Sequence, residues 1–369
     1  MLWYLVICAL MFFPCAIDRA GALSGRKTRH IALMTACVIL WFFMAFRDIS
    51  VGVDTKYYSY VFTQFKEIPF SRVFTAVTYA DETRTWTFDF EPGYRLMNKL
   101  LSVFFHSPQA ITILNSTIIM VLWYNLIRRE SPDFMLSIWL LLTMGIYQTE
   151  MNVTRNAIAI LIAYNGFGYL RRGKPWHYTA VCVFASLFHV SALLFLPLYL
   201  LVRWVKVTPR MAMFLIGAAC LAGLLFLLVG QQLFVLLPEQ LAKYLLKDNE
   251  NIFSLLVGFL NGGVFVLAWL LLPIERRQEV WSRYQLGVMM LVINLCFFGI
   301  NIALRDASRM AALFGPYIII LIPRMLLLIP NRIHRREAAR LIMLMCGIQY
   351  VLRMLVNNIG GTLPYEFFW

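Results

Sequence analysis

Apolar stretches of roughly membrane-spanning length recur along almost the whole chain of 369 residues. A bilayer core about 30 Å thick requires about 20 residues of helix to cross it. Apolar residues make up 61% of the chain and charged residues 14%, whereas a soluble domain carries about 25% charged residues. These features exclude an ordinary soluble enzyme, a disordered protein and a secreted disulfide scaffold. They predict an all-α polytopic integral membrane protein.

We expect a single polytopic membrane domain over residues 1–369, with about 12 transmembrane or half-membrane helices. The first apolar run starts without a basic segment, which favours a retained first helix over a cleaved signal peptide. The stretch from Trp176 to Trp204 is divided at His189, because polar groups at mid-membrane require a turn or a cavity. The expected spans lie near residues 1–17, 31–46, 109–127, 134–149, 156–170, 175–189, 190–203, 211–237, 252–273, 284–304, 310–330 and 341–356.

The basic residues are divided unevenly between the two sets of loops. One set holds 19 of the 33 Lys and Arg residues and six of the 19 acidic residues. The opposite set holds 13 of each, and Arg324 lies within a span. Because cytoplasmic loops carry an excess of Lys and Arg, we expect the first set to face the cytoplasm and both termini to face outward. Topology thereby explains the net charge of +14, and no nucleic-acid partner is expected.

Sequence motifs exclude several kinds of chemistry. The chain has no G-x-x-x-x-G-K-[ST] or G-x-G-x-x-G motif, so nucleotide-driven transport is not supported. It also has no H-E-x-x-H, G-x-S-x-G or C-x-x-C pattern. We therefore expect neither a metal site nor a cofactor.

The long outward loop, residues 47–109, carries the first group of candidate site residues. Loops of this length in compact proteins are usually functional. Glu91 before Pro92 indicates a helix start, because an acid suits the positive end of a helix and proline suits its first turn. An amphipathic helix is predicted to follow, either as a simple surface helix or as a lid or lipid-chain guide. Its apolar stripe is Tyr94, Met97, Leu101 and Phe104, and Arg95, Asn98, Lys99 and Ser102 lie on other faces.

Further polar residues lie at the outward ends of predicted spans. Asn152, Arg155 and Asn156 share one helix face, and His189 lies alone in an apolar context. A second stripe comprises Asn294, Asn301, Arg305 and Arg309. Each group has a structural alternative: Arg155 as a snorkelling residue, His189 as a structural histidine, and the arginine pair as a helix cap or phospholipid contact.

Outward arginines at membrane depth suit an anionic substrate attached to a lipid. Guanidinium groups bind phosphate oxygens in pairs and stay charged. An attacking sugar hydroxyl also needs a group that accepts its proton. The candidate bases are Asp54, Glu91 and His189, with Asp54 preferred. The tyrosines Tyr57, Tyr58 and Tyr94 could stack on sugar rings.

Several motifs, taken in order, resemble the EpsG-type branch of the Wzy polysaccharide polymerases. They are Phe46-Arg47-Asp48, Val51-Gly52-Val53-Asp54-Thr55 with Tyr58, Glu91-Pro92-Gly93-Tyr94, Leu96-Met97-Asn98, Thr154-Arg155-Asn156, Phe188-His189, Ser191-Ala192-Leu193, Leu196-Pro197-Leu198-Tyr199 and Pro364-Tyr365. The resemblance covers nearly the whole chain. In this sequence Asn156 follows Arg155, where the family more often has Gln.

The resemblance implies polymerisation of undecaprenyl-pyrophosphate-linked oligosaccharide units on the outer side of the bacterial cytoplasmic (inner) membrane. The product would be O-antigen, capsule or exopolysaccharide. Pyrophosphate or substrate contacts are assigned to Arg47, Asp48, Tyr58, Arg155, Asn156, Arg305 and Arg309. The implied partners are the lipid-linked donor and acceptor, membrane lipids, a chain-length regulator and a flippase.

Two other functions are compatible with parts of the sequence. A transporter or flippase of lipid-linked saccharide would show internal repeats and charges through the midplane, whereas the charges here gather on one side. A membrane O-acyltransferase would favour a catalytic histidine that receives its acyl donor from the cytoplasm. His189 lies toward the outward side instead, so the polymerase is the preferred hypothesis.

Overall fold

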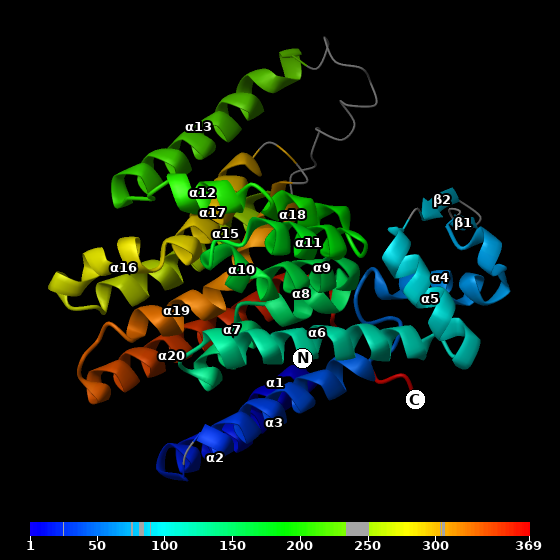
Figure 1. Cartoon of the computed structure of the whole chain (residues 1–369), viewed down its shortest axis with the longest axis horizontal. Coiled ribbons are helices and arrows are strands. Elements are labelled where there is room, and N and C mark those ends of the chain that lie inside the picture. Colours follow the sequence, from blue (N-terminus) through cyan, green and yellow to red (C-terminus); the bar gives the residue numbers. More distant parts are fainter. Residues whose placement is uncertain are drawn as a thin grey trace. The chain divides into compact units, whose positions relative to one another are not determined.

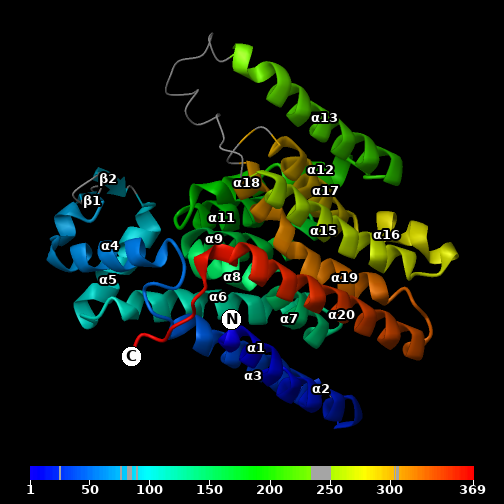
Figure 2. The ribbon, with the colours of Figure 1, turned by 180° about the vertical axis from the view of Figure 1, so that it is seen from behind.

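The computed structural model describes residues 1–24, 26–74, 77–80, 85–88, 90–233, 251–302, 304 and 307–369. The chain forms two compact units, which are described separately. Unit 1 comprises Met1–Tyr199 and Gly347–Trp369, and unit 2 comprises Leu200–Cys346. Helices predominate in both units (Figures 1 and 2). A helix satisfies all its backbone polar groups internally, which is required in a medium without water.

The elements of unit 1 are α1 (Leu2–Leu10), α2 (Phe12–Ser24), α3 (Arg26–Ala45), α4 (Thr55–Glu67), η1 (Phe70–Arg72), β1 (Val77–Ala80), β2 (Thr85–Phe88), α5 (Pro92–Phe104), α6 (Gln109–Glu130), α7 (Phe134–Thr143), α8 (Ile146–Asn152), α9 (Thr154–Asn165), α10 (Phe167–Arg171), α11 (Pro175–Ser186), η2 (Val190–Phe195) and η6 (Ile359–Gly361). Those of unit 2 are α13 (Pro209–Leu233), α15 (Asn251–Leu270), η4 (Ile274–Arg276), α16 (Arg277–Arg283), α17 (Gln285–Ile300), α18 (Ala307–Phe314), η5 (Gly315–Tyr317) and α19 (Ile318–Leu326). Two helices cross the division between the units, α12 (Leu198–Trp204) and α20 (Arg332–Asn357).

Several helices have the length and composition of membrane spans. Among the described residues, five qualify: Lys27–Ala45, Gln109–Glu130, Pro209–Phe226, Ala307–Leu326 and Arg332–Val356. A sixth span results if Ile274–Arg283 and Gln285–Ile300, which are bent by 85°, are counted together. Shorter apolar helices occur at Leu2–Asp18, Phe134–Thr143, Val190–Trp204 and Leu260–Leu270.

The predicted multi-pass, helical character is therefore confirmed, and the count of about 12 spans stays a prediction. Several expected spans are divided between two helices in the structure: 1–17 between α1 and α2, 134–149 between α7 and α8, and 156–170 between α9 and α10. The final residues of another, 211–237, lie outside the described residues.

The core of unit 1 is built on helix α6, which packs against α3 on one side and α9 on another. Small side chains allow these helices to approach each other closely. On α3, Ala32, Ala36 and Leu40 are fully buried at helical spacing, and on α9 so are Ala159 and Ala163. This packing fixes the C-terminal end of α3 and the N-terminal ends of α6 and α9, from which the site described below is built.

The segment after α20 returns to the start of the outward loop. Phe367 pairs with Arg47 in an antiparallel bridge. The Gly52 N–H donates to the Gly361 carbonyl oxygen at 3.0 Å. Gly52 has a φ of +93°, a conformation that side chains other than glycine rarely adopt. The chain therefore turns here, directly before α4, against a backbone from the other end of the sequence.

The described residues of the loop 47–109 form a packed module. Helices α4 and α5 pack through an apolar cluster of Tyr58, Val61, Phe62, Phe65, Val73, Phe90, Tyr94 and Ile111. Between them, β1 and β2 pair antiparallel, with Val77 opposite Phe88 and Ala80 opposite Thr85. The all-α prediction was incomplete here, because it missed this hairpin. Its alternating β-branched and aromatic residues were the available signal.

In unit 2, α15 packs against α17 through glycines. An added Cβ on Gly258 would lie 2.5 Å from Cγ of Phe298, and one on Gly262 would lie 3.3 Å from a Leu295 methyl carbon. The Gly258-x-x-x-Gly262 stripe is thus a helix-packing contact. By contrast, a Cβ on Gly263 of the same helix meets nothing within 4 Å.

This difference predicts that Gly258→Ala is destabilising relative to Gly263→Ala. Both changes raise helix propensity by up to about 1 kcal/mol, and Gly258→Ala alone forces a side chain into Phe298, an overpacking cost of about 1–3 kcal/mol. Thermal unfolding of the purified protein in detergent measures the difference. Equal melting temperatures for the two variants would contradict the packing described here.

Candidate functional site

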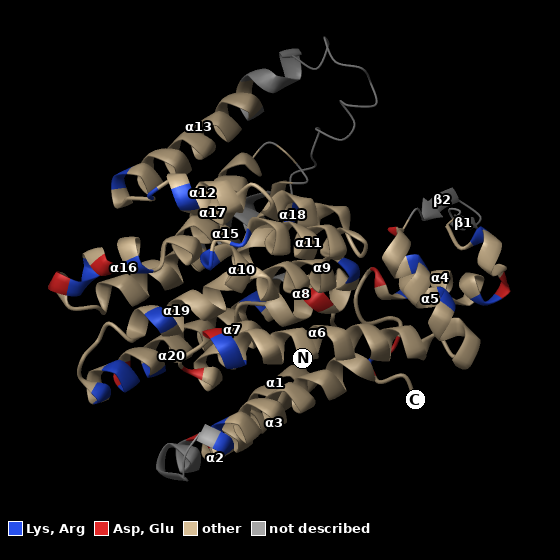
Figure 3. Cartoon of the chain, viewed as in Figure 1, with Lys and Arg blue, Asp and Glu red and all other residues tan. Residues whose placement is uncertain are grey.

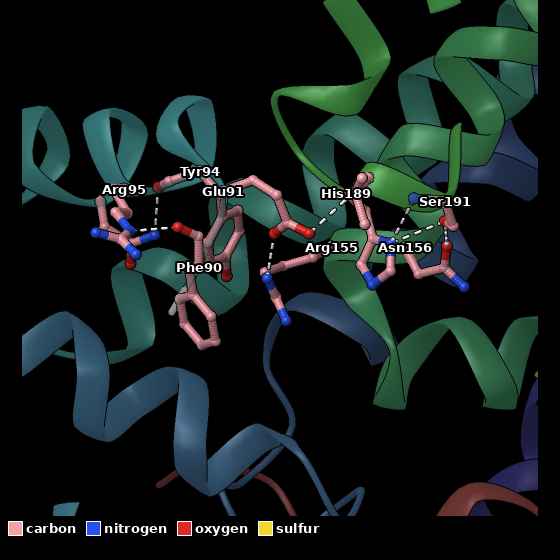
Figure 4. Close-up of polar contacts among 10 residues, drawn as sticks. Phe90, Glu91, Tyr94, Arg95, Arg155, Asn156, His189 and Ser191 are labelled. Carbon is pink, nitrogen blue, oxygen red and sulfur yellow. Dashed lines mark hydrogen bonds and ion pairs between the residues drawn. The ribbon is translucent and has the colours of Figure 1, made fainter. Parts of the chain in front are cut away.

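Glu91 lies directly before helix α5 and joins that helix to two other segments. Its side chain makes no capping hydrogen bond to its own helix. Its Oε2 instead pairs with Arg155, the second residue of α9, and its Oε1 accepts the backbone N–H of Val190 at 3.1 Å (Figure 4). One carboxylate therefore connects α5, α9 and the start of η2.

Arg155 is held between this acid and two aromatic rings. Its guanidinium carbon lies 3.9 Å from the ring centroid of Phe90 and 5.7 Å from that of Tyr94. The side chains of Arg155 and Glu91 are only 17% and 16% exposed. A snorkelling arginine would instead extend its charged group into water. Cation–π contacts of this kind are worth about 0.5–2 kcal/mol, so the position of the guanidinium is well defined.

Gly93 allows α5 to approach the end of α11. An added Cβ would lie 2.7 Å from Cβ of Leu187 and 2.8 Å from its carbonyl oxygen. That same oxygen accepts the Tyr94 N–H at 3.1 Å. A side chain at position 93 would separate these backbones. The glycine therefore brings the start of α5 to the segment that carries His189.

His189 belongs to a short hydrogen-bonded chain. Its Nδ1 accepts the Ser191 N–H at 3.2 Å and lies 2.8 Å from the Ser191 hydroxyl, which donates to Oδ1 of Asn156 at 2.8 Å. The neutral ring, with Nδ1 accepting, is assigned its proton on Nε2. His189 is thus arranged to donate a hydrogen bond from Nε2.

Asp54 and Tyr58 bring the start of α4 to the ion pair. The Asp54 N–H donates to Oδ1 of Asn152 at 2.7 Å, which ties α4 to the end of α8. The buried Tyr58 ring lies 6.0 Å from the rings of both Phe90 and Tyr94. Burial raises the pKa of Tyr58; the Arg155 charge opposes this and the Asp54 charge adds to it. The Asp54 carboxylate and the Arg155 guanidinium are therefore both close enough to influence the Tyr58 hydroxyl electrostatically.

Charged residues of both signs lie around this site and also at the opposite ends of the unit 1 helices. Figure 3 shows both basic and acidic residues around α4 and α5. At the other ends of the unit 1 helices, Arg171 pairs with Glu130, and Arg29 with Asp18 at 3.1 Å. The structure brings Asp54, Glu91 and Arg155 together with Tyr58, Asn156 and His189, and a role of these residues in substrate binding or catalysis stays a prediction.

A family model for the EpsG family matches residues 30–367 of the chain. The chain belongs to the EpsG family. The match confirms the resemblance seen in the motifs, and it indicates a membrane polysaccharide polymerase-type function. No curated protein and no solved structure matched the chain.

In this EpsG-family chain, Arg47 and Asp48 contact the backbone. The Arg47 side chain is 1% exposed and donates to the carbonyl oxygens of Met44 and Met151, the latter at 2.7 Å. The Asp48 carboxylate accepts the Ser50 N–H at 2.9 Å. These contacts secure the end of α3 against α8. A substrate contact by Arg47 or Asp48 stays a prediction.

The second predicted arginine pair belongs to unit 2. Arg305 lies outside the described residues, and Arg309 lies in α18. In the same stripe, Asn294 donates to the Ala311 carbonyl oxygen at 2.7 Å, and Asn301 accepts the Ser308 N–H at 3.1 Å. Both asparagines thus join α17 to α18. The pyrophosphate role of Arg305 and Arg309 stays a prediction.

Sequence reasoning missed the buried polar row that supports the site from α6. Asn115 is 1% exposed and donates to the Tyr94 hydroxyl at 2.9 Å and to the Thr154 hydroxyl at 3.3 Å. Asn115 therefore holds Tyr94, in the helix that follows Glu91, and Thr154, the residue before Arg155. The available signal was the helical spacing of four polar residues in an apolar span, Gln109, Thr112, Asn115 and Ser116, all of which are buried.

The ion pair predicts that Glu91→Gln is more destabilising than a matched change in an exposed pair. Glutamine can still accept the Val190 N–H, but it leaves the Arg155 charge partly buried without its carboxylate, which costs about 1–3 kcal/mol. The control is Glu337→Gln, because Arg340 and Glu337 are 61% and 59% exposed and such pairs contribute about 1 kcal/mol or less. Thermal unfolding in detergent compares them; equal losses would contradict a supporting role for Glu91.

Proposed function

We propose that this protein polymerises undecaprenyl-pyrophosphate-linked oligosaccharide units into a surface polysaccharide, such as O-antigen, capsule or exopolysaccharide. The reaction takes place on the outer side of the bacterial cytoplasmic membrane, with both termini on that side. The observation that carries the proposal is the fixed Arg155 guanidinium, placed among an acid, a buried phenol and aromatic rings in a membrane protein of the EpsG family.

The proposed reaction breaks one bond and forms another at the same sugar carbon. The bond between the anomeric carbon of the growing chain and its pyrophosphate oxygen breaks. A hydroxyl of the incoming lipid-linked unit bonds to that carbon, and its proton passes to a base. The pyrophosphate leaves on its lipid carrier, with both electrons of the broken bond. Arg155 stabilises the negative charge that develops on the leaving oxygens.

The contacts described above support a division of roles among the three candidate bases. Glu91 is occupied by Arg155 and the Val190 N–H, so it positions the arginine. His189, with its proton assigned to Nε2, donates to a sugar or phosphate oxygen. Asp54 remains the proposed base, at the N-terminal end of α4. Tyr58 and Asn156 line the same cluster and are proposed to contact substrate.

The proposed partners follow from the reaction. Donor and acceptor are both lipid-linked oligosaccharides, so a flippase must first deliver them to the outer side. A chain-length regulator is proposed as a further protein partner.

Loss of the protein is expected to remove the polysaccharide ladder and leave single repeat units, as seen on a polysaccharide gel.

Complementation of a deletion strain with Arg155→Ala should fail to restore the ladder at equal protein level, and Arg155→Lys should restore only part of it, because a point charge replaces the guanidinium fork. The control is Arg340→Ala, which should restore the ladder fully. Arg340 is exposed, and the distribution of basic residues predicts that it lies on the cytoplasmic side. A full ladder with Arg155→Ala would overturn the proposed role of Arg155. A deletion strain with an intact ladder would overturn the polymerase function.

Asp54→Asn is expected to lower polymerisation by about 10²–10⁴-fold, because assistance by proton transfer is typically of that size. Asparagine preserves the shape and the backbone contact to Asn152 while removing the proton acceptor. Glu67→Gln, an exposed acid at the other end of α4, is the matched control and should polymerise normally. Rates are measured from ladder growth in membrane preparations. Normal growth with Asp54→Asn would overturn the assignment of Asp54 as the base.

A further inference from the structure

Helix α5 directs its polar side chains inward and its apolar side chains outward. Its buried residues are Tyr94, Arg95, Asn98, Lys99 and Ser102. We define the α5 outer face as Leu96, Leu100, Val103 and Phe104, which are 41%, 48%, 52% and 76% exposed. A helix that faces water would show the reverse arrangement. The two remaining apolar residues of the predicted stripe, Met97 and Leu101, pack inward against the α4–α5 cluster.

The buried polar groups hold α5 in this orientation. The Lys99 ammonium donates to the Phe65 carbonyl oxygen at 2.9 Å, near the end of α4, where a helix is electronegative. The Arg95 guanidinium donates to the carbonyl oxygens of Phe74 and Phe90. A rotation of α5 that exposed its polar side would break these hydrogen bonds and would bury its apolar side chains instead. The outward direction of the apolar residues is therefore built into the module.

Helix α4 gives an internal comparison, because it packs against α5 and its exposed residues differ in character. Its exposed residues include Lys56, Lys66 and Glu67, all of them charged. The outer side of α4 thus has the composition of a water-facing surface. Every exposed residue of α5, by contrast, is apolar. The two-helix module consequently has one polar and one apolar side.

The α5 outer face continues toward a membrane span. Helix α5 ends at Phe104, and the span in α6 begins at Gln109. The few residues between them reach at most about 3.5 Å each, so the end of α5 lies close to the membrane boundary. Phe105, directly after the helix, is also 54% exposed. The apolar side of the module therefore lies only a few residues along the chain from a candidate membrane span.

From these observations we infer that the α5 outer face is immersed among the lipid acyl chains at the outer interface of the bilayer. Membrane lipid is the occupant that matches a helix face without charge, joined directly to a membrane span. The inference concerns the membrane contact of α5 alone and does not depend on the polymerase proposal.

Site-directed spin labelling tests this inference in the full-length protein. A ketone-bearing amino acid at position 100 is coupled to a nitroxide, which leaves the native cysteines unlabelled. The protein is reconstituted into nanodiscs of phosphatidylethanolamine and phosphatidylglycerol. Accessibility to oxygen, which concentrates in lipid, is compared with accessibility to a water-soluble nickel chelate. Position 67 on α4 is the matched control, and position 96 is a second α5 label should the first impair folding.

The ratio of oxygen to nickel accessibility is expected to be several-fold higher at positions 100 and 96 than at position 67. Equal ratios at all three positions, with strong nickel accessibility, would show that the face lies in water and would overturn the inference. Low accessibility to both reagents at positions 100 and 96 would show that a second copy of this chain or another protein covers the α5 outer face. That result would also overturn the inference.

Discussion

The ion pair between Glu91 and Arg155 is the contact on which the outward end of unit 1 depends. A guanidinium that is mostly removed from water needs a compensating charge, and Glu91 supplies it from a different segment. The same carboxylate accepts the Val190 N–H, so the start of η2 is fixed as well. Gly93 then sets how close α5 comes to Leu187. The relative positions of α5, α9 and the His189 segment all follow from these short contacts.

The rest of the module shows how a membrane protein accommodates polar groups in an apolar environment. An unpaired buried polar group is costly where water cannot compensate it. Lys99 is therefore directed to a carbonyl oxygen of α4, Arg47 to backbone oxygens of α3 and α8, and Asn115 to two hydroxyl groups. Each of these side chains also links two segments. Polar groups thereby specify the arrangement of helices that apolar packing alone would leave less defined.

Much of the architecture could be predicted from the sequence, because hydropathy and charge report on the membrane directly. The helix that begins at Pro92 and the spans around α3 and α6 follow from such patterns. The pairing of Glu91 with Arg155 could not be predicted, because it depends on tertiary contacts between segments far apart in the sequence. The inward direction of Arg95 and Lys99 could not be predicted for the same reason. Both lie off the predicted apolar stripe, and their carbonyl partners belong to segments outside α5.

The return of the C-terminal segment has a consequence for the order in which the protein assembles. The Tyr365 hydroxyl donates to the Phe43 carbonyl oxygen at 2.5 Å across a sequence separation of 322 residues. Gly361 and Phe367 contact the loop before α4 in the same way. Every intervening helix must be inserted before these contacts can form. The module consequently acquires its final backbone partners late in biogenesis, and an incompletely inserted chain would lack the backbone contacts of Arg47 and Gly52.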